Sequence, residues 1–152
     1  MDSPVGGLGI IEDNQKIGGL FFRNGKKAQK PGAGIILGET ALIKKTIIQL
    51  EEYFKGKRKV FDIPLLLQGT TFQLAVWNSL LKIPYGRTKS YKEIAAMAGN
   101  AKASRAVGLA NNRNPIAIIV PCHRVIGADG SLTGYGGGLE KKQFLLELEQ
   151  KY

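Results

Sequence analysis

The sequence predicts an α+β protein with two domains, and three observations lead to this prediction. Short β-prone runs separated by turn residues fill the start of the chain, and a helical periodicity follows them. The second half carries helix start and stop signals in close succession. At 152 residues the chain is long enough for two small domains. We expect a sheet-plus-helix domain over residues 1–65 and a mainly helical domain with a helix-turn-helix over residues 66–152.

The N-terminal domain is predicted to hold a β-hairpin followed by one helix. Residues 5–11 and 17–22 are β-prone, and a polar turn separates them. Residues 41–54 carry apolar side chains at helical spacing, which predicts an amphipathic helix with Thr40 as its N-cap. Its apolar positions are Ile43, Ile47, Leu50 and Phe54. Residues 61–65 read as an extended linker, because Pro64 biases the residue before it away from helix.

The second domain opens with two helix start signals. Thr70 and Gln73 fit a capping box, and the helix that follows runs to about Leu81. A Pro-Tyr-Gly break at residues 84–86 ends it. Ser90 and Glu93 fit a second capping box, which predicts a short helix to about residue 98.

A third helix completes the predicted helix-turn-helix. Gly99 suits the end of the preceding helix and Asn100 the N-cap of the next, which we expect over about residues 101–110. Helical hairpins with glycine turns are common, so this pattern alone leaves DNA binding open. Most side chains of this helix are small, and Gly108 costs on the order of 1 kcal/mol relative to Ala in a helix interior. That cost suggests close approach to a groove of DNA or, alternatively, tight packing on a neighbouring helix.

The positive charge is concentrated in the same segment. The chain has 22 basic and 12 acidic side chains, for a formal net charge of +10. Residues 82–124 hold eight basic side chains against one acidic one, a net +7, whereas residues 125–152 have a net charge of −1. The excess points to an anionic partner, with nucleic acid as the first candidate and an anionic membrane surface as the second. A charge that serves solubility alone is the alternative interpretation.

The composition excludes several classes of protein. One Cys and one His can form neither an internal disulfide nor a structural zinc site, so we expect no metal. The first residues show no basic region followed by an apolar core, and no apolar run approaches the roughly 20 residues that cross a bilayer. We therefore expect a cytoplasmic protein without a membrane partner.

The lone cysteine follows an apolar run. Residues 116–120 are β-branched or small, and two prolines bound them, which predicts a short buried strand that ends beside Cys122. Such a cysteine is by default an inert apolar side chain. Its neighbours His123 and Arg124 instead suggest a thiolate with a pKa well below the reference value of about 8.5. Adjacent side chains on an extended backbone diverge, so contact between Cys122 and His123 requires a water or a local turn.

These residues carry a family resemblance. The segment Pro-Cys-His-Arg-Val at residues 121–125 resembles the active-site motif of the O6-alkylguanine-DNA alkyltransferases, DNA repair proteins that reverse damage directly. Further segments match that family in order and spacing, and the likeness is close over residues 69–149. They are residues 72–77, 83–86, 90–91, 103–108, 114–115 and 134–139.

The resemblance implies four catalytic side chains. Cys122 would accept the alkyl group, and His123 would deprotonate it through a water. Glu149 would hydrogen-bond His123 and fix its tautomer. Tyr91 would donate a proton to the departing guanine. Without the resemblance, Glu149 reads as a solvated acid on a helix face and Tyr91 as an aromatic residue packed on the core.

The resemblance also implies contacts with substrate and DNA. Arg105 would replace a flipped nucleotide in the duplex, with the small helix in the minor groove. Asn114 would be a hinge between the helix-turn-helix and the cysteine segment. Tyr135 and the glycine loop would wall the pocket, and backbone groups near Cys122 would read the guanine edge. The full set of these contacts is Ser90, Ala103, Ser104, Arg105, Gly108, Asn114, Val120, Arg124, Tyr135 and Gly136.

The implied function is direct reversal of DNA damage. The alkyl group of O6-alkylguanine, and of O4-alkylthymine, would pass irreversibly from double-stranded DNA to Cys122 of a monomer, without any cofactor. The chain departs from the family in two ways. Gly136 stands where many members have Ser, which bears on access to the pocket, and the zinc site of some relatives cannot be built here.

Three alternatives remain open at this point. An alkyltransferase-like protein recognises such lesions without repairing them, but members of that group replace the acceptor cysteine, commonly with Trp. A helix-turn-helix regulator with a structural Cys122 would bind DNA by sequence and take up no label. A Cys-His hydrolase would turn over its substrate.

Overall fold

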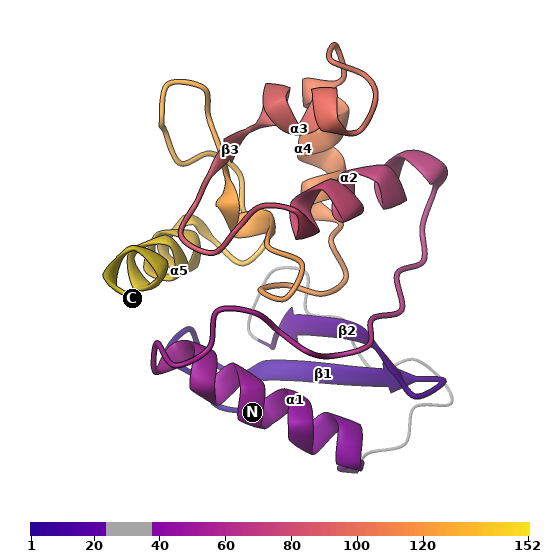
Figure 1. Ribbon diagram of the computed structural model, residues 1–152, viewed down its shortest axis with the longest axis vertical. Coiled ribbons are helices and arrows are strands. Elements are labelled where there is room, and N and C mark those ends of the chain that lie inside the picture. The colour runs from indigo at the N-terminus through magenta and orange to yellow at the C-terminus, as the bar shows by residue number, and fades with distance from the viewer. Residues whose placement is uncertain (24–37) are drawn as a thin grey trace.

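The computed structural model describes residues 1–23 and 38–152, and it is α+β as the sequence predicts. A hairpin and helix α1 form one layer, and the remaining helices gather above it (Figure 1). A single buried apolar core runs through both parts, from Leu8 and Leu20 in the hairpin to Trp77 and Leu145 in the helices.

The hairpin consists of β1 (Leu8–Asp13) and β2 (Lys16–Phe22), which pair antiparallel. Asn14 and Gln15 join the strands with φ values of 51° and 61°, the left-handed conformation that a two-residue hairpin turn requires. Ile17 and Leu20 are fully buried. The predicted hairpin is confirmed.

Helix α1 (Ala41–Phe54) begins where the sequence predicts it. The Thr40 hydroxyl accepts a hydrogen bond from the Ile43 N–H at 3.1 Å. The predicted apolar face is only partly right, because the helix buries Thr46, Gln49, Leu50 and Tyr53. Thr46 can be buried because its hydroxyl donates to the Leu42 carbonyl, and the Gln49 amide hydrogen-bonds the backbone of the linker at Asp62 in both directions.

The second edge of β2 joins the two halves of the molecule. The linker is extended and pairs with this edge, since the Ile17 N–H donates to the Pro64 carbonyl at 2.9 Å. Further along the same edge, the Leu20 N–H donates to the Pro115 carbonyl and the Leu20 carbonyl accepts from Ala117. The segment that leads to Cys122 is therefore hydrogen-bonded to the N-terminal sheet.

Local capping signals predict the next helices well. Helix α2 (Thr71–Leu81) has both hydrogen bonds of the Thr70–Gln73 capping box. Strand β3 (Lys89–Ser90) leads into α3 (Tyr91–Met97), where the Ser90 hydroxyl accepts from the Glu93 N–H at 3.1 Å. The Glu93 carboxylate faces Lys89 instead of returning to the N-cap.

Helix α4 (Ser104–Asn112) begins later and ends later than predicted. Gly99 ends α3 with a φ of +94°, as expected of a glycine in that position. Asn100 is not the N-cap, because its side chain accepts from the Lys102 N–H and closes a turn instead. Ala103 occupies the N-cap position without a side-chain hydrogen bond.

The predicted strand over residues 116–120 is wrong. Only Ile116 pairs with β2, and the chain then turns back, with the Val120 N–H donating to the Ile116 carbonyl at 3.0 Å. The Asn114 side chain spans this turn, accepting from the Ile116 N–H and donating to the Val120 carbonyl. Ile118 takes a φ of +69°, a strained conformation for a β-branched residue. The run is apolar because the turn is buried, not because it belongs to a sheet.

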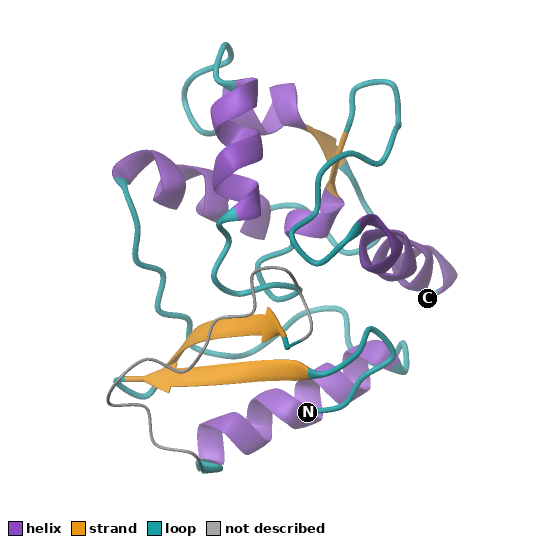
Figure 2. Cartoon of the chain, turned by 180° about the vertical axis from the view of Figure 1, so that it is seen from behind, coloured by secondary structure: helices purple, strands orange, loops and turns teal. Residues whose placement is uncertain are grey.

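The C-terminal part places a short turn against a helix. A 3₁₀ turn η1 (Cys122–Arg124) leads into β4 (Val125–Ile126), which pairs parallel with β3. Helix α5 (Leu139–Lys151) packs on η1, and Figure 2 shows it beside that turn. Within residues 1–23 and 38–152, no helix has the length and apolar character needed to cross a membrane.

Candidate active site and nucleic-acid interface

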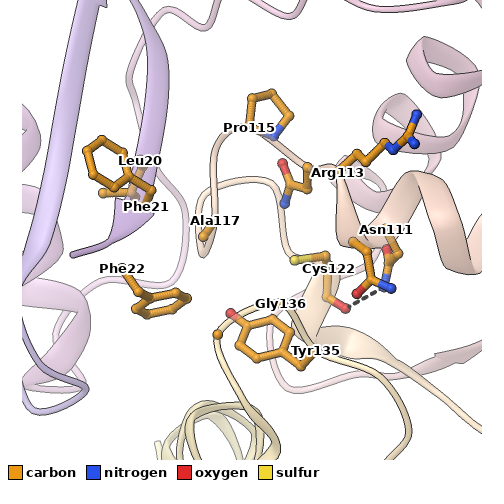
Figure 3. A pocket seen from close by; sticks show the side chains of 13 residues that line it. Leu20, Phe21, Phe22, Asn111, Arg113, Pro115, Ala117, Cys122, Tyr135 and Gly136 are labelled. Atoms are coloured by element: carbon orange, nitrogen blue, oxygen red, sulfur yellow. Dashed lines mark hydrogen bonds between the residues drawn. The ribbon is translucent and has the colours of Figure 1, made fainter. Parts of the chain in front are cut away.

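Cys122 lies in the wall of a cavity of about 560 Å³ between β2 and the helical part. Its sulfur faces the space that Phe22, Ala117 and Tyr135 border (Figure 3). The side chain is only 4% exposed, and the cysteine is the first residue of η1. The backbone at Cys122 and His123 is therefore not extended but turned. Contact between these two side chains requires such a turn, or a water.

A buried hydrogen-bonded group lies behind the cysteine. The Nε2 of His123 is 2.8 Å from Oε2 of Glu149, and both side chains are almost fully buried. The Nε of Arg124 donates to Oε1 of the same carboxylate at 2.7 Å, and a second guanidinium nitrogen also contacts it. Arg124 further donates to the Ile83 carbonyl at 2.7 Å. Glu149 thus lies between the imidazole and the guanidinium.

The charges of this group follow from its contacts. Burial opposes ionisation of Glu149, but the hydrogen bonds and charges of His123 and Arg124 outweigh it and lower the pKa of the carboxyl. Burial lowers the pKa of His123, although Glu149 works in the opposite direction. The pair therefore consists of a carboxylate and a neutral imidazole at neutral pH. Nε2–H donates to Glu149, and Nδ1 keeps a lone pair with no hydrogen-bond partner within the described part of the chain.

The environment of the thiol differs from the prediction. Burial raises the pKa of the Cys122 thiol, while the neighbouring Asn114 amide and the charge of Lys142 lower it only in part. Arg124, which the sequence suggested as a thiolate-stabilising cation and substrate contact, is instead held by Glu149 and the Ile83 carbonyl. Cys122 is thus a protonated thiol that needs a base.

Lys142 is a functional candidate that sequence reasoning missed. Its side chain is fully buried, and Nζ donates to the Thr133 carbonyl at 2.9 Å and lies 3.4 Å from that of Gly134. Burial lowers its pKa, and the negative charge of a Cys122 thiolate raises it. A lysine in a run of charged residues looks solvated in the sequence. Only its place on the buried side of α5 reveals it.

Two asparagines hold the backbone around the cysteine. Asn114 spans the turn that follows α4 and lines the cavity, which suits the hinge position that the resemblance implies. Asn111, which the sequence analysis did not select, donates to the Cys122 carbonyl at 3.1 Å from the buried side of α4 (Figure 3).

The backbone groups expected to read guanine are already engaged. The Val120 carbonyl accepts from Asn114 and from the Cys122 N–H. The Cys122 carbonyl accepts from Asn111 and from the Val125 N–H. Each of these carbonyls accepts two hydrogen bonds from within the chain, so reading of the guanine edge by Val120 and Cys122 stays a prediction that requires a shared or exchanged contact.

Tyr91 stands apart from the cavity wall. It is the first residue of α3, and its hydroxyl donates to the Thr133 carbonyl at 2.7 Å. It is absent from the described residues that line the cavity. Donation to a leaving guanine therefore requires this hydroxyl to exchange its partner.

The cavity wall combines residues from the N-terminal hairpin and from the helical part of the chain. Tyr135 and Gly136 line it as the resemblance implies, and the Tyr135 hydroxyl is buried without a partner in the described residues. The opposite wall consists of Phe21 and Phe22 of β2, with the Phe22 ring edge-on to Tyr135 at a centroid distance of 6.0 Å. Sequence reasoning missed this wall, because the hairpin lies about 100 residues from Cys122 in the chain.

The expected DNA contacts divide into exposed and capping residues. Arg105 is exposed on α4 and makes no hydrogen bond or ion pair within the described residues. A Cβ added to Gly108 would meet no atom within 4 Å, so packing on a neighbouring helix does not explain this glycine. Ala103 and Ser104 stand at the start of α4 and are half-buried. The Ser90 hydroxyl is occupied as the N-cap of α3.

One buried thiol and a histidine–carboxylate pair lie next to a cationic helix-turn-helix, which defines the class of proteins that carry a reactive cysteine and bind nucleic acid.

Comparison with models of known protein families identifies the family. The model of the 6-O-methylguanine DNA methyltransferase ribonuclease-like domain matches residues 1–67, and that of the DNA binding domain matches residues 71–151. The chain belongs to the 6-O-methylguanine DNA methyltransferase family, as its motifs indicate.

Individual relatives span nearly the whole chain. The methylated-DNA–protein-cysteine methyltransferase of Methanosarcina acetivorans is 53% identical over 148 residues, covering 97% of this chain and 94% of the relative. That of Mycobacterium tuberculosis is 49% identical over 155 residues, covering 99% of this chain and 90% of the relative. The crystal structure of M. tuberculosis OGT in complex with DNA has a TM-score of 0.91 at 47% identity, covering 99% of this chain and 91% of that one. The likeness thus extends to the N-terminal part, beyond residues 69–149 over which the motifs match closely.

Proposed function

We propose that this protein repairs DNA by transferring the alkyl group of O6-alkylguanine, and of O4-alkylthymine, from duplex DNA to Cys122. The observation that carries the proposal is the buried Cys122 thiol in a cavity wall, with the His123–Glu149 pair behind it. Relatives about 50% identical over nearly the whole chain carry the name methylated-DNA–protein-cysteine methyltransferase. The residue roles below are part of the proposal.

The first step is removal of the thiol proton. Nδ1 of His123 has a lone pair and no described partner, so it accepts the proton of Cys122 through one bridging water. Glu149 holds the ring in the tautomer with hydrogen on Nε2 and stabilises the imidazolium that forms. Arg124 keeps Glu149 ionised and in place. The nearby charge of Lys142 stabilises the thiolate.

The second step is an in-line displacement at the alkyl carbon. The sulfur forms a C–S bond as the C–O6 bond breaks, and the electron pair of that bond leaves on guanine. Tyr91 donates its hydroxyl proton to the departing guanine once that hydroxyl leaves the Thr133 carbonyl, and normal guanine results. The Tyr91 phenolate then takes a proton from water and the His123 imidazolium releases the thiol proton to water, so both side chains return to their neutral forms and the protons balance. The thioether is not hydrolysed, so each molecule reacts once.

DNA reaches this site by nucleotide flipping. A thiol in a cavity wall cannot reach an alkylated base that is stacked inside a duplex. The base must therefore leave the stack and enter the cavity. Arg105 fills the space left in the stack, and the bare backbone at Gly108 permits close approach of α4 to the minor groove. Tyr135 and Gly136 border the base.

Three finer features complete the proposal. The division into two domains near residues 65 and 66 is supported by the two family models, which match residues 1–67 and 71–151. Leu66 still hydrogen-bonds Ile17 of the N-terminal sheet, which favours a boundary one or more residues later. We infer a monomer that works in the cytoplasm. No cofactor enters the reaction as written.

Stoichiometry tests the proposal against its rivals. Native protein is mixed with a fivefold excess of duplex containing one O6-methylguanine, and repaired guanine is counted by chromatography of the nucleosides. We expect repair to stop at one guanine per protein molecule, with none for Cys122→Ser. Continued turnover would indicate a hydrolase, and tight binding of the lesion without any repair would indicate a recognition protein.

A further inference from the structure

Helix α4 exposes a large apolar side chain that no part of the fold requires. Leu109 is 63% exposed. It lies four residues after Arg105 and three before Asn112, so these three side chains share one face of the helix. The opposite face, with Val107, Ala110 and Asn111, is the one that packs into the core. Leu109 therefore does not stabilise the folded chain through burial.

The surroundings of Leu109 are cationic. Arg105 lies on its own face, and the exposed Lys102 and Arg113 stand before and after the helix. No acidic side chain occurs between Glu93 and Asp129 in the sequence. An exposed leucine among cations fits a polyanion that also offers apolar surface, and the sugars and bases of a duplex minor groove provide both.

We propose that Leu109 is an apolar wedge that enters the minor groove beside Arg105 and holds it open during nucleotide flipping. This inference rests on the proposed function. It assigns to Leu109 a positioning role that is separate from the replacement of the flipped nucleotide by Arg105.

The dimensions of the helix and the groove support a wedge. An α-helix with its side chains is about 10–12 Å across, whereas the minor groove of B-DNA is only about 6 Å wide. Small side chains reduce this mismatch but do not remove it, so the groove must widen as α4 enters. Apolar side chains inserted at base steps open the minor groove in this way. Residues four apart on a helix are about 5–6 Å apart, which places Leu109 within two base steps of Arg105 at roughly 3.4 Å per step.

The position of Leu109 along the helix also relates it to the site. Asn112, one turn further on the same face, lines the cavity that contains Cys122. Leu109 therefore lies between the place where Arg105 enters the stack and the mouth of the cavity. A groove held open at this point keeps the extruded nucleotide on the side of the cavity.

Salt-dependent binding tests the proposal. The affinity for an O6-methylguanine duplex is measured by fluorescence anisotropy at several NaCl concentrations for the Leu109→Ala and Leu109→Met variants. Loss of an apolar contact should weaken binding about tenfold at every salt concentration. The slope of log K against log salt should stay that of the native protein, because no phosphate contact is lost. Leu109→Met should restore most of the affinity.

Two comparison variants set the scale. Lys102→Ala removes an exposed charge and should lower the slope by about 1 if this lysine contacts a phosphate. Ile48→Ala removes a 54% exposed apolar side chain from α1, far from α4, and should bind as the native protein does. Thermal melting of Leu109→Ala should match the native protein, since the side chain is exposed.

The outcomes separate this inference from the proposed function. If the native protein repairs the duplex and Leu109→Ala binds it as tightly as the native protein, the wedge is wrong while alkyl transfer stands. A reduced slope for Leu109→Ala would also overturn it, and so would a self-association in solution that Leu109→Ala abolishes. If the native protein takes up no alkyl group at all, the proposed function fails first.

Discussion

At the scale of single residues, the reactivity of Cys122 depends on a base more than on an intrinsically acidic thiol. Burial raises the pKa of the thiol, and the nearest cation in the sequence, Arg124, is bound to Glu149 instead. His123 is neutral, since its own pKa is lowered, and its Nδ1 has no hydrogen-bond partner among residues 1–23 and 38–152. The site therefore keeps its thiol protonated until a base removes the proton.

This arrangement predicts how Cys122 responds to pH. Because burial raises the pKa of the thiol above its reference value of about 8.5, alkylation by iodoacetamide should be slow at pH 7 and still rise with pH above about 8.5. Mass spectrometry of the intact protein measures this directly, because the chain has a single cysteine. A rate that levels off below pH 8 would show that the thiol pKa is lowered, contrary to this account.

Arg124 provides a second prediction at this scale. The Arg124→Leu substitution leaves the buried Glu149 without its guanidinium partner, which should cost about 3–5 kcal/mol of unfolding free energy. Urea denaturation measures the loss, and Lys44→Leu on the exposed side of α1 is the matched control for removal of a charge. A loss below about 0.5 kcal/mol, the range of ordinary surface substitutions, would mean that the pair does not stabilise the fold.

At the scale of elements, Gly108 lowers the stability of α4 and leaves part of its surface without a side chain. A Cβ at Gly108 would meet nothing within 4 Å, so Gly108→Ala should raise the unfolding free energy by about 0.5–1 kcal/mol. The same methyl group should weaken binding to duplex DNA, because it fills the closest point of approach. Melting temperature and anisotropy measure the two effects. A variant that is more stable and binds DNA equally well would refute the role of Gly108.

A substitution of Arg105 distinguishes the flipping of the base out of the duplex from the alkyl transfer that follows. Arg105→Ala should reduce the repair of duplex DNA far more than the reaction with free O6-methylguanine base, because only the duplex needs flipping. Single-turnover rates on the two substrates give the comparison, with Lys44→Ala in α1 as the control. Equal losses on both substrates would argue against insertion of Arg105 into the stack.

The elements also show where sequence reasoning ends. Thr40, Thr70 and Ser90 were correct helix starts, because capping depends on residues three positions away. The turn at residues 116–120 was mistaken for a strand. Its shape depends on the side chain of Asn114 and on pairing with Leu20, neither of which appears in a pattern of apolar residues.

At the scale of the whole molecule, the cavity forms where strand β2 meets the helical part of the chain. The family resemblance predicts Cys122, His123 and Glu149 as catalytic residues, and the structure brings the latter two into contact. Phe21 in the cavity wall and Lys142 near the thiol could not be selected from the sequence. Their positions follow from contacts between segments that lie far apart in the chain.

The central claim is that Cys122 itself becomes the alkylated product. Native protein is incubated with duplex containing O6-methylguanine, and the intact mass and the peptide that carries Cys122 are measured. The account predicts the addition of one methyl group per molecule, located on Cys122, and no addition to Cys122→Ala. A methyl group on the Ala variant, or native protein that repairs the DNA while its own mass stays unchanged, would contradict it.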